Sequence, residues 1–248
     1  MIIRADDLGL SEAVNYGIFK AVRNKVLNNV SLLVNLEHTS HGFHLIHKMD
    51  VCIGLHANIS VGIPLTELNR IPSLVNHNQF KKSSVYRNAD EDIVDLDEAI
   101  LEIENQLKHF KKEFKRIPDY IDFHAVPSAQ FIRATKIVAK RHRLPFIGVN
   151  LDGTPAEVEG KQMRFQVSSG ENVENLVTTF KKMLENSTED IIDLMVYHPG
   201  FIDIDLIDKS SLVQQRIYDA AFLASSDLRE YVTKENIKLV QLNHLRNV

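Results

Sequence analysis

Apolar residues along this chain alternate between short continuous runs and longer stretches with helical spacing. Runs of four or five apolar residues are typical of strands that are covered on both faces of a parallel sheet. We therefore expect strands at 2–5, 30–34, 51–55, 120–123, 146–149, 164–167, 194–197 and 237–240, the sixth being the weakest.

Helical spacing is clearest from Asp92 to Phe114, where apolar residues recur every three or four positions. Further helices are expected after Ser11, across the histidine-rich stretch 38–47, and at 131–139, 176–184, 213–223 and 228–232. Strands that alternate with helices predict an α/β fold with a parallel sheet. We expect one (βα)-barrel-like domain over residues 1–248, regular or distorted, with about seven or eight strands and a long loop excursion at about 62–90.

The composition and charge of the chain exclude some classes of function. A hydrophobic fraction of 44% and a charged fraction of 25% are typical of a globular protein with a substantial core. The net charge of -4 gives no long-range attraction for phosphate backbones, so we expect no nucleic-acid partner. The sequence shows no signal-peptide pattern and no long apolar span, which predicts a cytoplasmic protein without a membrane partner. Cys52 is the only cysteine, so no intrachain disulfide forms, and we interpret it as a buried, inert thiol.

Side chains with metal-binding or proton-transfer chemistry follow four of the expected strands. Asp6 and Asp7 follow the first strand, His56 the third, His124 the fourth and His198 the strand at 194–197. The carboxyl ends of parallel strands meet at one rim of an α/β barrel, where such folds carry their chemistry. These side chains are therefore expected to converge on one site.

The residue types suggest a division of labour. Two adjacent carboxylates repel each other unless a cation or a shared proton offsets the repulsion, so one suits a metal and the other suits a proton. One carboxylate and two imidazoles from different strands suit a divalent ion with open positions for water and substrate. Asp122 shares a strand face with His124 and is placed to orient a metal-bound imidazole.

Each residue taken singly has a second interpretation. The aspartates also suit a polar turn that caps the next helix, His56 a hydrogen-bonded core position, and His198 a ring packed against its own turn. A separate set of histidines recurs every third residue, but such a repeat rotates around a helix and does not form one face. We interpret it as the exposed side of the second helix: His38, His41, His44 and His47.

Four segments of the chain, taken together and in order, resemble the motifs of the YdjC-like carbohydrate deacetylases. They are 5–11 (ADDLGLS), 54–58 (GLHAN), 122–124 (DFH), preceded by Glu102 and Gln106, and 197–200 (YHPG). The resemblance spans nearly the entire chain. It implies a barrel-like fold and removal of the N-acetyl group from an acetylated amino sugar or short chitooligosaccharide.

The resemblance also implies roles for the residues at the strand ends. Asp7, His56 and His124 would bind one divalent ion, Asp6 would be the general base and His198 the acid. The family metal is usually taken to be magnesium, although two imidazoles and a carboxylate suit zinc or another transition metal at least as well. Family members commonly continue the third motif with alternating histidines, whereas this chain has Ala-Val-Pro at 125–127, which predicts a shifted sugar preference.

The remaining candidates concern substrate contact. Since the chain has no tryptophan, sugar stacking would rest on tyrosine or phenylalanine. We expect contacts of this kind, or support of the metal ligands, from Asp122, Asn58, Tyr16, Tyr86 and Phe201. The partner expected is a small acetylated amino sugar, and a homodimer is plausible.

Two alternatives to a deacetylase stay open at this point. One is a metal-dependent sugar isomerase or phosphate-handling barrel enzyme, for which more carboxylate ligands would be expected. The other is a catalytically silent sugar-binding regulatory protein, which the altered segment after His124 would suit.

Overall fold

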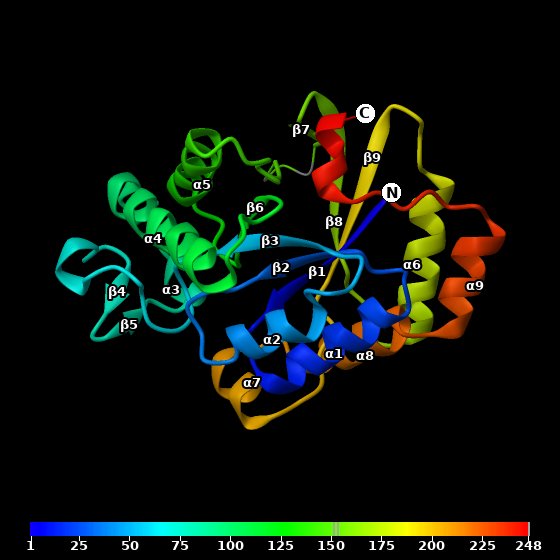
Figure 1. The fold of residues 1–248 in the computed structure, drawn as a ribbon, viewed down its shortest axis with the longest axis horizontal. Coiled ribbons are helices and arrows are strands. Elements are labelled where there is room, and N and C mark those ends of the chain that lie inside the picture. The colour runs from blue at the N-terminus through cyan, green and yellow to red at the C-terminus, as the bar shows by residue number, and fades with distance from the viewer. Residues whose placement is uncertain (151, 153, 248) are drawn as a thin grey trace.

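A curled seven-stranded sheet forms the centre of the protein (Figure 1). The computed structural model describes residues 1–150, 152 and 154–247. The strand order is β6-β3-β2-β1-β9-β8-β7, with β7 antiparallel to β8 and all other pairs parallel. The strands are β1 (Ile2–Leu8), β2 (Asn29–Leu32), β3 (Cys52–Ala57), β6 (Ile121–Phe123), β7 (Ala156–Val158), β8 (Lys161–Val167) and β9 (Ile191–Tyr197).

Helices cover the convex side of this sheet. Figure 1 shows α1, α2 and α8 along the middle strands, α4 and α5 at the β6 end, and α6 and α9 at the other end. In the described part of the chain, no helix combines the length and the apolar character needed to cross a membrane. The helices are α1 (Glu12–Arg23), α2 (Thr39–Ile46), α3 (Ser83–Arg87), α4 (Leu96–Phe114), α5 (Ala129–Arg141), α6 (Val173–Glu185), α7 (Ile204–Lys209), α8 (Gln214–Leu223) and α9 (Ser226–Lys234).

Both faces of the central strands are buried, which explains their continuous apolar runs. Ile3 and Ile53 belong to the large core between the sheet and its helices. Ile2 and Cys52 point to the opposite face and join a smaller core inside the curl, which the short 3₁₀ helix η2 (Leu242–Asn247) covers with Leu242. The expected α/β, barrel-like architecture is confirmed, and Cys52 is a buried free thiol, as predicted.

The excursion at 62–90 carries its own small elements: η1 (Leu68–Arg70), the hairpin β4 (Val75–Asn76) and β5 (Gln79–Phe80), and α3. The carboxylate of Glu102 on α4 accepts hydrogen bonds from the backbone N–H groups of Leu65 (3.1 Å) and Thr66 (2.9 Å). Tyr86 is buried, and its hydroxyl donates to the carbonyl of Ile59 at 3.0 Å. The excursion is therefore anchored to the body of the protein at both ends.

Two expected strands are absent from the described residues. At 146–149 the chain makes a single parallel bridge, between Phe146 and Ile121, before it leaves the sheet. At 237–240 the backbone pairs with no strand: Val240 N–H donates to the carbonyl of Met1 at 3.0 Å, and the carbonyl of Lys238 accepts from the amino group of Met1 at 3.1 Å. Both segments are apolar because their side chains pack against the two cores, not because they extend the sheet. The edge strand β7 was not expected, because its three residues make no apolar run.

Candidate metal centre and active site

The five candidate side chains lie at the carboxyl ends of strands that are close together in the sheet. Asp6 and Asp7 lie near the carboxyl end of β1, and His56 lies near the end of β3. His124 follows β6 directly, and His198 follows β9 directly. One rim of the sheet therefore carries all five.

The backbone at Asp7 allows two adjacent carboxylates to serve one site. Successive residues of a regular strand point to opposite faces, so Asp6 and Asp7 would ordinarily diverge. Asp7 instead has a φ of 72°, in the left-handed region that aspartate tolerates better than most residues. The pairing register of β1 with β2 shifts between Ala5 and Leu8, where this reversal lies. Both carboxylates therefore remain at the rim.

Three potential ligand atoms converge beside Asp7. Asp7 Oδ1 lies 2.9 Å from His124 Nδ1 and 3.5 Å from His56 Nε2, and the two imidazole nitrogens are 3.3 Å apart. Ligands about 2.1 Å from an ion lie about 3.0 Å apart at right angles and about 3.4 Å apart at tetrahedral angles. Within the described residues, no well-aligned hydrogen bond reaches the buried Asp7 Oδ1. The spacing and this unsatisfied oxygen fit a divalent ion with one oxygen and two nitrogen ligands.

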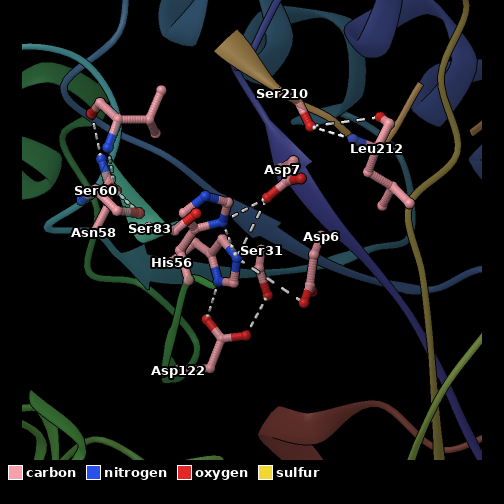
Figure 2. A network of polar contacts seen from close by, with 12 residues as sticks. Asp6, Asp7, Ser31, His56, Asn58, Ser60, Ser83, Asp122, Ser210 and Leu212 are labelled. Atoms are coloured by element: carbon pink, nitrogen blue, oxygen red, sulfur yellow. Dashed lines mark hydrogen bonds and ion pairs between the residues drawn. The ribbon is translucent and has the colours of Figure 1, made fainter. Parts of the chain in front are cut away.

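A buried polar network holds His56 in place. Figure 2 shows His56 between Asp7 and Asp122, with Ser31 beside Asp122. The Nδ1 atom of His56 lies 2.9 Å from Asp122 Oδ1, which leaves Nε2 directed at Asp7. Asp122 Oδ2 accepts a 2.9 Å hydrogen bond from the Ser31 hydroxyl and forms a 2.9 Å ion pair with Arg4. A carboxylate on the far nitrogen fixes the orientation of a metal-binding imidazole.

Without a metal ion, the groups around His56 and Asp7 favour a positive charge on the imidazole and a negative charge on the carboxylate. Burial lowers the pKa of His56, but the carboxylates of Asp122 and Asp6 outweigh it and raise the pKa to about 10. Burial raises the pKa of Asp7, but His124 and Arg216 outweigh it and hold the pKa well below its ordinary value. Without a metal ion, protonated His56 therefore supplies the positive charge that a bound cation would supply.

Asp6 is held by a different cation. Arg4 donates from Nε to Asp6 Oδ1 at 2.7 Å and from Nη2 to Asp6 Oδ2 at 2.8 Å, and both side chains are buried. Asp6, His56 and Asp122 form a second cluster with metal-ligand spacing. Because the Arg4 guanidinium already pairs with both of its carboxylates, this second cluster needs no metal. The set around Asp7 is the better metal centre.

His198 lies on the other side of the rim. Its backbone N–H donates to Asp219 Oδ2 at 2.8 Å. Burial lowers the pKa of its ring, and together with Arg216 it outweighs the opposing effect of nearby carboxylates, of which Asp7 is the strongest. The turn that follows passes between two helices: Gly200 N–H donates to the Arg216 carbonyl on α8 at 3.1 Å, and a Cβ on Gly17 of α1 would lie only 2.5 Å from Gly200 Cα.

Helix α8 supplies two residues of the candidate site that were not predicted from the sequence. Arg216 is buried, and its Nη2 donates to Asp7 Oδ2 at 2.6 Å, so it orients the carboxylate whose other oxygen faces the imidazoles. Asp219, one turn later, holds the backbone of His198. Neither lies in a strand-end pattern, so no local sequence feature pointed to them. Arg4 could have been noticed from the sequence, because it is a charged residue within an apolar strand, two residues before Asp6.

The other candidate contact residues lie outside the metal centre. Asn58 is buried, and its side-chain amide holds the following turn through Val61 O at 2.7 Å and Ser60 N at 2.9 Å. Tyr86 is buried beneath the excursion. Tyr16 and Phe201 are partly exposed, Tyr16 against His41 and Phe201 beneath Lys20.

The repeated histidines flank or lie on α2, and within the described residues no three of them come within metal-ligand spacing of one another. His38 pairs with Asp205 at 2.8 Å, whereas the His47 ring stacks on Phe43. His44 is exposed.

A polar cavity of about 350 Å³ opens beside the metal centre. Asp7, His124, His198 and Arg216 form its inner end. Its outer wall carries hydroxyl and cationic side chains from residues 60–87, from the end of α7 and from the segment after it, and Figure 2 shows Ser60, Ser83 and Ser210 around the site. These wall residues are Ser60, Ser83, Arg87, Lys209, Ser210 and Ser211.

Proteins with related sequences are known. A chitooligosaccharide deacetylase from Escherichia fergusonii is 30% identical over 251 residues, covering 96% of this chain and 96% of that protein. A carbohydrate deacetylase from Clostridium beijerinckii is 25% identical and covers 99% of each chain.

Solved structures agree on the fold. A protein named for cellobiose-phosphate cleavage, from Enterococcus faecalis, superposes with a TM-score of 0.81 at 23% identity, covering 97% of this chain and 96% of that one. A family 4 acetyl xylan esterase from Clostridium thermocellum, in complex with a cobalt ion, gives a TM-score of 0.52 at 12% identity, covering 99% of this chain and 89% of that one. The family model described as YdjC-like protein matches residues 1–234, and the chain therefore belongs to the YdjC-like protein family.

Proposed function

We propose that this protein is a metal-dependent carbohydrate deacetylase that hydrolyses the N-acetyl group of an acetylated amino sugar or short chitooligosaccharide. The observation that carries the proposal is the convergence of Asp7 Oδ1, His56 Nε2 and His124 Nδ1 within 3.5 Å of one another. A second carboxylate, Asp6, lies beside them, with Oδ2 3.9 Å from His56 Nε2. Family membership and the names of the relatives, which are carbohydrate and chitooligosaccharide deacetylases, support the same reaction.

Asp7, His56 and His124 would hold the ion. Two imidazoles and one carboxylate favour zinc or another transition metal over magnesium, which prefers oxygen ligands. When bound, the ion supplies Lewis acidity: it makes water more acidic and polarises the amide carbonyl. Arg216 keeps the second oxygen of Asp7 turned away from the imidazoles, so one oxygen remains for the ion.

Amide hydrolysis also needs one proton removed from water and one proton delivered to the departing nitrogen. Asp6 would take the proton as the water oxygen forms its bond to the carbonyl carbon. Arg4 holds Asp6 in position through two hydrogen bonds, so the carboxylate does not swing away from the rim. His198 would protonate the sugar nitrogen as the carbon–nitrogen bond breaks, and the products are acetate and the free amine.

The polar cavity would take the sugar. Its serine hydroxyls from the excursion and from the segment after α7 offer hydrogen bonds to sugar hydroxyls. Arg87 and Lys209 line the same cavity, so it also suits a sugar that carries a phosphate group. The Enterococcus faecalis protein with the same fold is named for a phosphorylated disaccharide.

The roles are tested by measuring acetate release from N-acetylglucosamine oligomers with zinc-loaded and cobalt-loaded protein. We expect Asp6→Asn and His198→Ala each to lower kcat by about 10²-fold to 10⁴-fold, since each removes one proton-transfer group. His47→Ala, a histidine just beyond α2 that stacks on Phe43, is the control and is expected to keep the parental rate.

Three results would contradict the proposal in different ways. Acetate release at the parental rate by Asp6→Asn and His198→Ala would show that the proton-transfer roles are assigned wrongly. Bound metal in the parental protein without acetate release would favour the isomerase or phosphate-handling alternative. Neither metal nor acetate would favour a sugar-binding protein without catalysis.

A further inference from the structure

A second cavity, of about 290 Å³, opens beside the metal centre. His124, Ala125 and His198 line both cavities and so separate them. Asp6 and His56 contribute only to the second cavity. The two cavities therefore meet at the groups that would act on the amide bond.

The walls of the second cavity are apolar. They come from three parts of the chain that are distant in sequence: the turn after β6, the segment that leaves the sheet after Phe146, and the end of β8. The wall side chains are Val126, Pro127, Ile147, Val149, Phe165 and Val167. None of these side chains carries a hydrogen-bonding group.

Polar groups also line this cavity, and two of them already have partners. Asp6 is paired with Arg4 through two hydrogen bonds, and His56 is bonded to Asp122. A sugar ring placed between the apolar walls would lose hydrogen bonds to water without replacement, which is costly. An alkyl chain in the same place would lose none and would gain from burial.

We propose that the second cavity is the subsite for the acyl group and that it accepts linear acyl chains longer than acetyl. A methyl group needs about the volume of one water molecule, roughly 30 Å³, so an acetyl group fills only a small part of the 290 Å³. Val167, 49% exposed, lies on the open side and leaves room for the chain to extend. This inference rests on the proposed function, since it assigns the two sides of the same amide bond to the two cavities.

The test compares the zinc-loaded protein on N-acetyl, N-propionyl and N-butyryl glucosamine disaccharides, with the released amine as the readout so that every substrate gives the same signal. Each methylene that becomes buried in the transition state is expected to raise kcat/KM by about fourfold. The butyryl substrate should therefore exceed the acetyl substrate by roughly tenfold or more.

Variants then locate the effect. Val167→Trp and Val149→Phe narrow the cavity and are expected to lower the butyryl-to-acetyl ratio of kcat/KM at least tenfold, while the acetyl substrate keeps kcat/KM within about threefold. Val85→Trp on α3 is the matched control, because Val85 is 45% exposed and outside both cavities, and its ratio should not change.

Two outcomes would overturn the inference. One is a drop of tenfold or more in kcat/KM from acetyl to propionyl, which would mean that the acyl group is not in the large cavity. The other is an equal loss on all three substrates in both cavity variants, which would mean that the cavity holds the sugar. Failure of the protein to hydrolyse any of the three amides would overturn the proposed function instead.

Discussion

Metal binding is expected to release a proton, and the amount follows from the environment of His56. In the metal-free protein, two carboxylates raise the pKa of His56 to about 10, so at pH 7.5 this imidazole holds its proton. An ion that binds through Nε2 must displace that proton. Zinc affinity should therefore rise about tenfold per pH unit, or about 30-fold between pH 7.5 and 9.0, with close to one proton released per ion.

Calorimetric titration with zinc, in buffers of different ionisation enthalpy and with a competing chelator, measures both quantities. Asp122→Asn removes the carboxylate that contributes most to the raised pKa of His56, so proton release should fall and zinc affinity should drop about 10-fold to 100-fold. Glu104→Gln is the control, because Glu104 on α4 pairs with His142 away from the site.

The raised pKa of His56 also affects the stability of the protein. Because the folded-state pKa of His56 is raised, its contribution to the stability of the metal-free protein is complete below about pH 6.5 and is lost as pH rises toward about 10. The metal-free protein should become less resistant to urea across this range, and bound zinc should remove this pH dependence. A zinc affinity that does not change with pH, without proton release, would refute the reasoning.

Other substitutions test separate parts of the structure. Arg216→Met should weaken zinc binding about tenfold, because Asp7 loses the 2.6 Å hydrogen bond that orients it; unchanged affinity in a chelator competition would contradict this. Gly54→Ala should lower the free energy of unfolding by about 1–3 kcal/mol, since the new Cβ would lie 2.2 Å from Tyr120 Cε2, and an unchanged urea midpoint would rule that clash out. Lys209→Met should raise KM for a phosphorylated acetylated disaccharide at least fivefold more than for the unphosphorylated one, and an equal change for both would exclude a phosphate contact.

The sequence was informative about the rim of the sheet because strand ends are local features. An apolar run followed by Asp6, His56 or His198 marks a strand and its carboxyl end, and the parallel arrangement then brings these ends together. The period of two in a strand predicts that Asp122 and His124 lie on one face. In the structure both side chains contact His56, which agrees with that prediction. These inferences needed no knowledge of the helices.

Residues supplied by helices were beyond the reach of this reasoning. Arg216 reaches Asp7 across 209 residues of sequence, and a single arginine in an amphipathic helix has no pattern that distinguishes it from a surface charge. The left-handed backbone of Asp7 was equally hidden, since aspartate adopts ordinary strand geometry as well. The segment at 237–240 was interpreted as a strand because burial by packing and burial within a sheet produce the same apolar run.

The 198–200 turn passes through a narrow space between α1 and α8, so the rate of turnover depends on packing at residues that do not contact the reacting atoms. Gly200 packs so closely against Gly17 that no side chain fits between them, and its N–H donates a hydrogen bond to the carbonyl of Arg216. Even one methyl group at position 17 would act as a wedge that displaces the 198–200 turn relative to Asp7. A change of this kind would slow the enzyme while leaving every group that meets the substrate chemically intact, so loss of rate in a variant of this protein does not by itself mark a residue as a participant in the reaction.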